Sequence, residues 1–163
     1  MAKDDSDTGT AVAGTGIDAG LLTTFVGYHI RLTQLAVFRR VESELDHAGL
    51  TPPRYALLTL IKANPGLVQS RLAEAVVLDR STLVPALDRL EGDGLIERRP
   101  SPTDKRSNEI WITAKGSRLL AALEPKIVAL EERLAAGLSD ADRRKLVGML
   151  RRIRANAQEI GEG

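Results

Sequence analysis

The residues whose side chains are most able to bind a ligand lie between positions 79 and 106 of this 163-residue chain. Ser81 and Thr82 carry hydroxyl groups that can bind phosphate oxygens or the edges of bases. Arg80 and Arg89 flank them with guanidinium groups, which suit phosphate and guanine. Hydroxyl and guanidinium groups at this spacing indicate a surface that binds nucleic acid.

A helix over residues 81–91 is expected to carry these groups, because the B-DNA major groove accepts one α-helix. Ser81 is expected to be its N-cap, since Pro85 lacks an N–H and costs about 3 kcal/mol deep inside a helix. Pro85 then lies on the polar side, where its ring can meet a thymine methyl. An ordinary amphipathic helix with a solvated face is the alternative. The expected buried face consists of Leu83, Ala86, Leu87 and Leu90.

Two strands are expected after this helix, Leu95–Arg99 and Asn108–Thr113, joined by a polar loop with two prolines. A helix-turn-helix followed by such a hairpin is a winged helix, an architecture that reads DNA. Lys105 and Arg106 at the tip suit the minor groove, whose narrow stretches attract arginine. Asp104 is expected to pair with an arginine and so to structure the wing. The residues predicted to contact DNA are Arg80, Ser81, Thr82, Pro85, Arg89, Arg98, Lys105 and Arg106.

The rest of the chain is expected to be mainly helical, because leucines and other apolar residues recur at spacings of three and four. Thr113 is expected to cap one helix, which Pro125 should kink, and Ser139 with Asp142 resembles a capping box. Residues 1–16 lack periodicity and are expected to be a disordered arm. The helices are expected over 20–47, 52–64, 68–76, 114–136 and 140–158.

Composition excludes several classes of protein. The chain has no cysteine, which rules out disulfides, thiolate metal sites and thiol-based redox sensing. No apolar run is long enough to span a membrane and no signal peptide is evident, so a cytoplasmic protein is expected. No cofactor is expected. Because the net charge is only +1, and acidic residues balance basic ones between 79 and 106, DNA binding must depend on charge placement.

The sequence around the predicted wing resembles the MarR family of transcriptional regulators. The resemblance covers about 45 residues in spacing and order, and the flanking helix layout agrees over about 20–158. The segments that carry it are Asp79-Arg80-Ser81-Thr82, Asp88-Arg89-Leu90-Glu91, Gly94-Leu95-Ile96-Glu97-Arg98, Asp104-Lys105-Arg106 and Ile112-Thr113-Ala114-Lys115-Gly116.

The resemblance implies a homodimer whose two winged heads straddle a pseudo-palindromic site. It places the DNA-binding head at 51–113 and dimerisation helices at 17–50 and 114–160. The apolar stripes of the end helices exceed what one small winged domain can cover, which favours burial against a second chain; a bundle within one chain is the alternative. Two-fold geometry then predicts half-sites about 10 bp apart.

Such regulators usually repress transcription until a ligand binds between the dimerisation helices and the head. Without cysteine, and with two histidines 18 residues apart, redox and zinc signals are disfavoured, and no metal is expected. A small organic anion is the remaining class of signal. The amino-acid sequence of residues 81–90 also resembles the same segment of family members that sense aromatic acids or aromatic acyl-CoA thioesters. The candidate ligand residues, which could instead serve packing or a solvated face, are Tyr28, His29, Arg31, Arg39 and Tyr55.

The sequence therefore predicts a ligand-responsive repressor that binds double-stranded DNA as a dimer. A winged-helix adaptor that binds protein and not DNA is the alternative, and the near-neutral charge of the head is its support. An enzyme is not expected, because no nucleophile–base pair, metal cluster or phosphate-binding glycine loop is evident.

Overall fold

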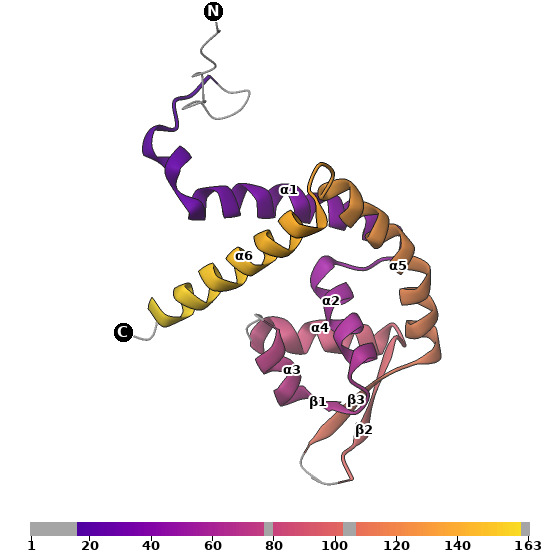
Figure 1. Ribbon diagram of the computed structural model, residues 1–163. Coiled ribbons are helices and arrows are strands. Elements are labelled where there is room, and N and C mark those ends of the chain that lie inside the picture. Colours follow the sequence, from indigo (N-terminus) through magenta and orange to yellow (C-terminus); the bar gives the residue numbers. More distant parts are fainter. Residues whose placement is uncertain (1–15, 77–79, 103–106, 161–163) are drawn as a thin grey trace, which may run out of the picture. The chain divides into compact units, whose positions relative to one another are not determined.

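The computed structural model describes residues 16–76, 80–102 and 107–160 (Figure 1). It is mainly helical with one small antiparallel sheet, as the sequence predicts. The chain divides into two compact units, Met1–Leu57 and Leu58–Gly163. The elements are η1 (Gly20–Thr24), α1 (Val26–Asp46), α2 (Pro52–Ala63), β1 (Leu67–Val68), α3 (Gln69–Ala75), α4 (Arg80–Gly92), β2 (Ile96–Pro100), β3 (Asn108–Ile112), α5 (Ala114–Leu134) and α6 (Asp140–Ile160).

In the first unit, the single helix expected over 20–47 is wrong at its start. The 3-10 helix η1 comes first, and Phe25 then takes an extended conformation before α1 begins. The hydroxyls of Thr23 and Thr24 donate to backbone carbonyls three residues earlier, at 3.0 and 2.8 Å, which favours a local turn over a continuous helix. The predicted end is confirmed: Gly49 has φ +64°, a conformation that glycine adopts readily.

In the second unit, β1 precedes helices α3 and α4, and β2 and β3 follow them. The three strands form one antiparallel sheet with the order β1-β3-β2. The hairpin of β2 and β3 matches the prediction within one residue, whereas strand β1 was not expected. Val68 explains the difference, because its extended backbone (φ −77°, ψ 148°) pairs with Glu109 and it makes no side-chain cap on α3. Helix α3 therefore begins at Gln69, one residue later than predicted.

The last two helices begin as the sequence predicts. The Thr113 hydroxyl accepts a hydrogen bond from the Gly116 N–H at 3.0 Å and caps α5. Pro125 lies inside α5, which curves along its length in Figure 1. Ser139 and Asp142 form the capping box of α6, with reciprocal backbone contacts of 3.2 and 3.3 Å. Within the described residues, no helix is both long and apolar enough to cross a membrane.

Candidate nucleic-acid interface

Helix α4 has one buried face and one exposed face. Leu83, Leu87 and Leu90 are at most 1% exposed and anchor the helix in the core. The other face presents side chains of mixed chemistry to solvent: Thr82, Val84, Pro85, Asp88 and Arg89. An apolar back and a small polar front are the features that a helix needs to enter a major groove.

The start of α4 differs from the prediction. The helix begins at Arg80, so Ser81 lies within it and is not its N-cap. Pro85 is consequently deeper in the helix than expected, and the hydrogen bond that its missing N–H would have made is absent. Strong packing of the three buried leucines offsets this local cost. The side chains of Arg80 and Ser81 lie outside what the structure describes.

The predicted wing is present as the hairpin of β2 and β3, with Arg98 opposite Ile110 in the register. A hydrogen bond of 3.0 Å from the Ser101 N–H to the Ser107 carbonyl closes the base of its loop. The predicted tip residues Asp104, Lys105 and Arg106 lie outside the described residues. The structure thus supplies the frame of the wing.

Arg98 joins the wing to the helix. Strand alternation places it on the same face as the buried Ile96, and from there its guanidinium reaches α4. One terminal nitrogen donates to the Asp88 carboxylate at 2.7 Å, and the other donates to the Glu91 carboxylate. Burial alone would lower the pKa of Arg98, but the hydrogen bonds and charges of Asp88 and Glu91 outweigh it and raise that pKa above its ordinary value.

Arg89 is accessible, unlike Arg98. Its side chain is 73% exposed, and its Nε lies 3.7 Å from an Asp93 carboxylate oxygen one turn further along α4. Exposed pairs of this kind are weak, so a phosphate can compete for the guanidinium. The burial and contacts of Arg89 fit its predicted role, and that role stays a prediction.

The outer face of the wing carries a cluster that the sequence analysis missed. The Arg99 guanidinium lies 4.8 Å from the centre of the Trp111 ring, and the indole N–H donates to Glu109 at 3.2 Å. Gly66 has φ +76°, and a Cβ there would lie 3.1 Å from the same indole, so the turn before β1 fits closely against the ring. Trp111 is the only tryptophan of the chain, and its presence in the second strand was the one sequence signal that could have indicated this cluster.

The junction between the wing and α5 holds the end of α4. The Lys115 ammonium donates to the Asp93 carbonyl at 2.7 Å, and the Thr113 hydroxyl donates to the Gly94 carbonyl at 2.8 Å. A Cβ on Gly116 would lie only 2.2 Å from the Leu95 carbonyl oxygen. Only glycine permits this close approach of the two backbones.

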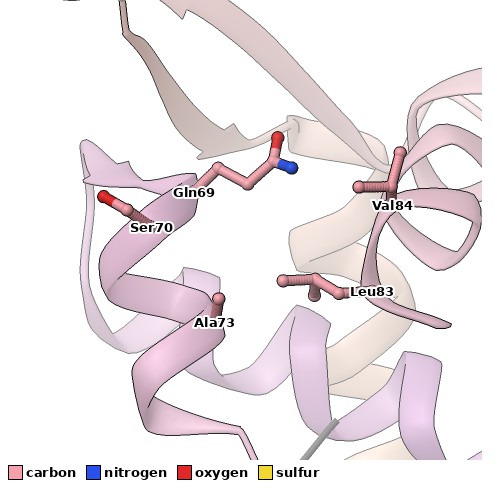
Figure 2. A pocket seen from close by; sticks show the side chains of 5 residues that line it. All are labelled: Gln69, Ser70, Ala73, Leu83 and Val84. Carbon is pink, nitrogen blue, oxygen red and sulfur yellow. The ribbon is translucent and has the colours of Figure 1, made fainter. Parts of the chain in front are cut away.

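A pocket of about 250 Å³ opens between α3 and α4. Figure 2 shows Gln69 extending from α3 toward Val84 of α4, with Ala73 of α3 and Leu83 of α4 below them in this view. Ser70 completes its lining. None of the five candidate ligand residues contributes to this pocket.

Those five ligand candidates all lie in the first unit. Tyr28 and Tyr55 are half-buried, and the Tyr28 and His29 rings meet edge to face at 5.7 Å between centroids. His29 Nε2 lies 2.7 Å from the Thr23 carbonyl and ties α1 to η1. Arg31 is exposed and donates to Gln34, and Arg39 is exposed as well. Their role in ligand binding stays a prediction.

Comparison with known proteins places the chain in a family. The sequence model of the MarR family matches residues 50–107. A Thauera aromatica protein named for transcriptional regulation of the hcr operon is 39% identical over 82% of this chain and 81% of its own length. The chain belongs to the MarR family. The transcriptional regulator HosA of Escherichia coli O111:H- is 36% identical over 64% of this chain and 77% of its own length.

Two solved structures show the same fold in functional complexes. The transcriptional repressor CouR, solved on a 23-mer DNA duplex, is 36% identical with a TM-score of 0.78, covering 85% of this chain and 98% of its own. The regulator PcaV of Streptomyces coelicolor, solved with its natural ligand, is 29% identical with a TM-score of 0.74, covering 83% and 96%. The match to these MarR-type structures confirms the predicted winged-helix fold.

Proposed function

We propose that this MarR-family chain is a homodimeric transcriptional repressor that binds a pseudo-palindromic DNA operator and is released from it by a small organic anion. The observation that carries the proposal is helix α4, whose leucines are buried while its Thr82, Pro85 and Arg89 face solvent beside a two-stranded wing. CouR, a repressor 36% identical to this chain, supports it because that protein was solved on duplex DNA.

In the proposed complex, α4 enters the major groove and the wing follows the adjacent minor groove. Thr82 and Pro85 face the bases, and Arg89 binds phosphate or guanine. The wing loop brings two further cations to the minor groove. The full set of proposed DNA contacts is Arg80, Ser81, Thr82, Pro85, Arg89, Lys105 and Arg106.

Exposed apolar side chains support the dimer. In the first unit Leu21, Phe25 and Phe38 are between 41% and 75% exposed, and in α6 Leu146 and Leu150 are each more than 40% exposed. Apolar groups at this density are uncommon on the surface of a soluble monomer. A second copy of the chain would remove them from water, and two-fold symmetry would then present two α4 helices to one duplex.

The effector proposal rests on the first unit. The half-buried Tyr28 lies on α1 and the half-buried Tyr55 lies on α2. Helix α1 also carries Arg31 and Arg39. Aromatic rings together with guanidinium groups suit an aromatic acid or its CoA thioester. PcaV, which is 29% identical, was solved with a natural ligand and supports effector binding in general. A ligand releases DNA only if it binds the released conformation more tightly.

Fluorescence anisotropy with the DNA upstream of the gene tests the proposal. We expect tight binding that weakens steeply with salt, and Arg89→Gln should weaken it at least fivefold without changing the melting temperature by more than a few degrees. Lys126→Gln, which removes a lysine from α5, is the matched charge control. A protein that binds no duplex at low salt would favour the adaptor function instead.

A further inference from the structure

We propose that Arg98 is a positioning residue and not a DNA contact: by bridging Asp88 and Glu91 it sets the wing at a fixed angle to helix α4. This inference rests on the proposed DNA-binding function and names the part that aligns its two reading elements. It also replaces the direct DNA contact that the sequence predicts for Arg98.

Three hydrogen bonds connect this one residue of β2 to one side of α4. The guanidinium uses its two terminal nitrogens on two carboxylates, with the Asp88 contact at 2.7 Å. The backbone N–H of Arg98 also donates to Glu91, at 3.1 Å. Because Asp88 and Glu91 are three residues apart on a helix, they lie on the same side of α4. A planar guanidinium held at both ends, together with its own backbone, restricts rotation of the strand against the helix.

The surroundings of the guanidinium favour this role over phosphate binding. The Arg98 side chain is only 20% exposed, compared with 73% for Arg89. Its Nε is buried and makes no hydrogen bond within the described structure. A phosphate approaching the terminal nitrogens would meet two carboxylates that already occupy them. Like charges in that arrangement repel, so DNA has little access to this cation.

The bridge also explains an acidic residue on the DNA-facing side of α4. The Asp88 side chain is 58% exposed, and an unpaired carboxylate there would repel the phosphates of the duplex. Arg98 offsets one of the two carboxylate charges of Asp88 and Glu91, so the three side chains together carry a net charge of −1. Asp88 therefore contributes to the geometry of the wing, although its charge alone opposes DNA binding.

Asp88→Asn is the decisive variant, because a pure charge effect and the loss of the bridge would change the affinity for DNA in opposite directions. If charge alone mattered, removing a carboxylate from this surface would strengthen binding to the upstream duplex. If the bridge positions the wing, we expect affinity to fall at least tenfold. Glu74→Gln is the matched control, because it removes a carboxylate from an exposed pair with Arg71 on α3 and should raise affinity slightly. Tighter binding by both variants would overturn the inference.

The salt dependence of Arg98→Gln separates positioning from contact. A positioning residue acts through the wing cations, so in a Lys105→Gln, Arg106→Gln background Arg98→Gln should leave the slope of log affinity against log salt unchanged. A phosphate contact reduces that slope by about 0.9 for each charge lost, about 1.8 for a dimer. Arg99→Gln, one residue along on the other face of β2, controls for loss of charge. A slope that Arg98→Gln reduces in that background, and Arg99→Gln does not, would assign Arg98 to the DNA contacts.

Acrylamide quenching of Trp111 tests the bridge without DNA. Trp111 is the only tryptophan and pairs with Glu97 on β2, so its accessibility reports the wing. We expect Asp88→Asn to raise the quenching constant at least 1.5-fold in the free, folded protein, and Glu74→Gln to leave it unchanged. If the wild type binds no DNA but quenching rises, the proposed function fails and the bridge stands. Unchanged quenching in Asp88→Asn overturns the bridge.

Discussion

Helices α4 and α6 both carry leucines at helical spacing, yet their burial is opposite. Leu83, Leu87 and Leu90 of α4 are at most 1% exposed, whereas Leu146 and Leu150 of α6 are 42% and 43% exposed. The same residue type thus completes a core in one helix and remains uncovered in the other. The helix-turn-helix therefore buries its leucines within one chain, and the exposed stripe of α6 is the surface that we propose a second chain covers.

The largest expected effect comes from the buried helix. Leu87→Ala removes a fully buried side chain and should lower the free energy of unfolding by about 2–5 kcal/mol. Urea unfolding measures it, with Leu150→Ala as the control. We expect the Leu150→Ala loss to be smaller and to depend on protein concentration, because it reports association. Equal, concentration-independent losses in both variants would remove the contrast between the helices.

The second effect concerns the uncovered stripe itself. Leu150→Glu places a charge where we propose a second chain to pack, and should weaken dimerisation at least 100-fold, about 2.7 kcal/mol. Sedimentation velocity measures the dimer fraction across concentrations. Circular dichroism of the variant should stay helical at low temperature. A wild-type chain that remains monomeric at high concentration would contradict the dimer.

Two glycines sharpen the comparison further. Gly116→Ala would force a Cβ to within 2.2 Å of the Leu95 carbonyl oxygen, and we expect a loss of about 1–3 kcal/mol. Gly148→Ala in α6 meets nothing within 4 Å and should gain up to about 1 kcal/mol from helix propensity. Thermal unfolding reports both. No loss of stability in Gly116→Ala would contradict the close approach of the two backbones at the junction between the wing and α5.

The smallest effect tests a helix cap. Ser139→Ala removes the hydroxyl that accepts the Asp142 N–H at 3.2 Å, and should cost about 1 kcal/mol. Hydrogen exchange of the first turn of α6 locates the loss, since only those amides should exchange faster. Unchanged exchange there would show that the capping box contributes nothing to the stability of α6.

Periodic patterns predicted the helices and the hairpin because their apolar residues repeat often enough to define a face. Strand β1 has only two residues, too few for any pattern, and its pairing with β3 depends on tertiary contact. The split at Phe25 was missed because the apolar spacing continues across it, whereas the hydroxyls of Thr23 and Thr24 decide the backbone.

Among the candidate site residues, the sequence predicted which side of α4 faces solvent, because helical spacing fixes that side. It did not predict that Arg98 turns inward to Asp88 and Glu91. The residue type alone does not show whether an arginine near a predicted DNA-binding helix binds a phosphate or a carboxylate. Strand alternation with Ile96 was the available signal, but the distance between β2 and α4 comes only from the fold.

Selection of binding sites from a random duplex library tests the central claim most directly. A dimer that presents two α4 helices and two wings should enrich inverted half-sites whose centres lie about 10 bp apart. Binding to the enriched duplex should exceed binding to scrambled DNA at least 1,000-fold at physiological salt. Enrichment of no sequence, or of single half-sites without two-fold symmetry, would contradict the account.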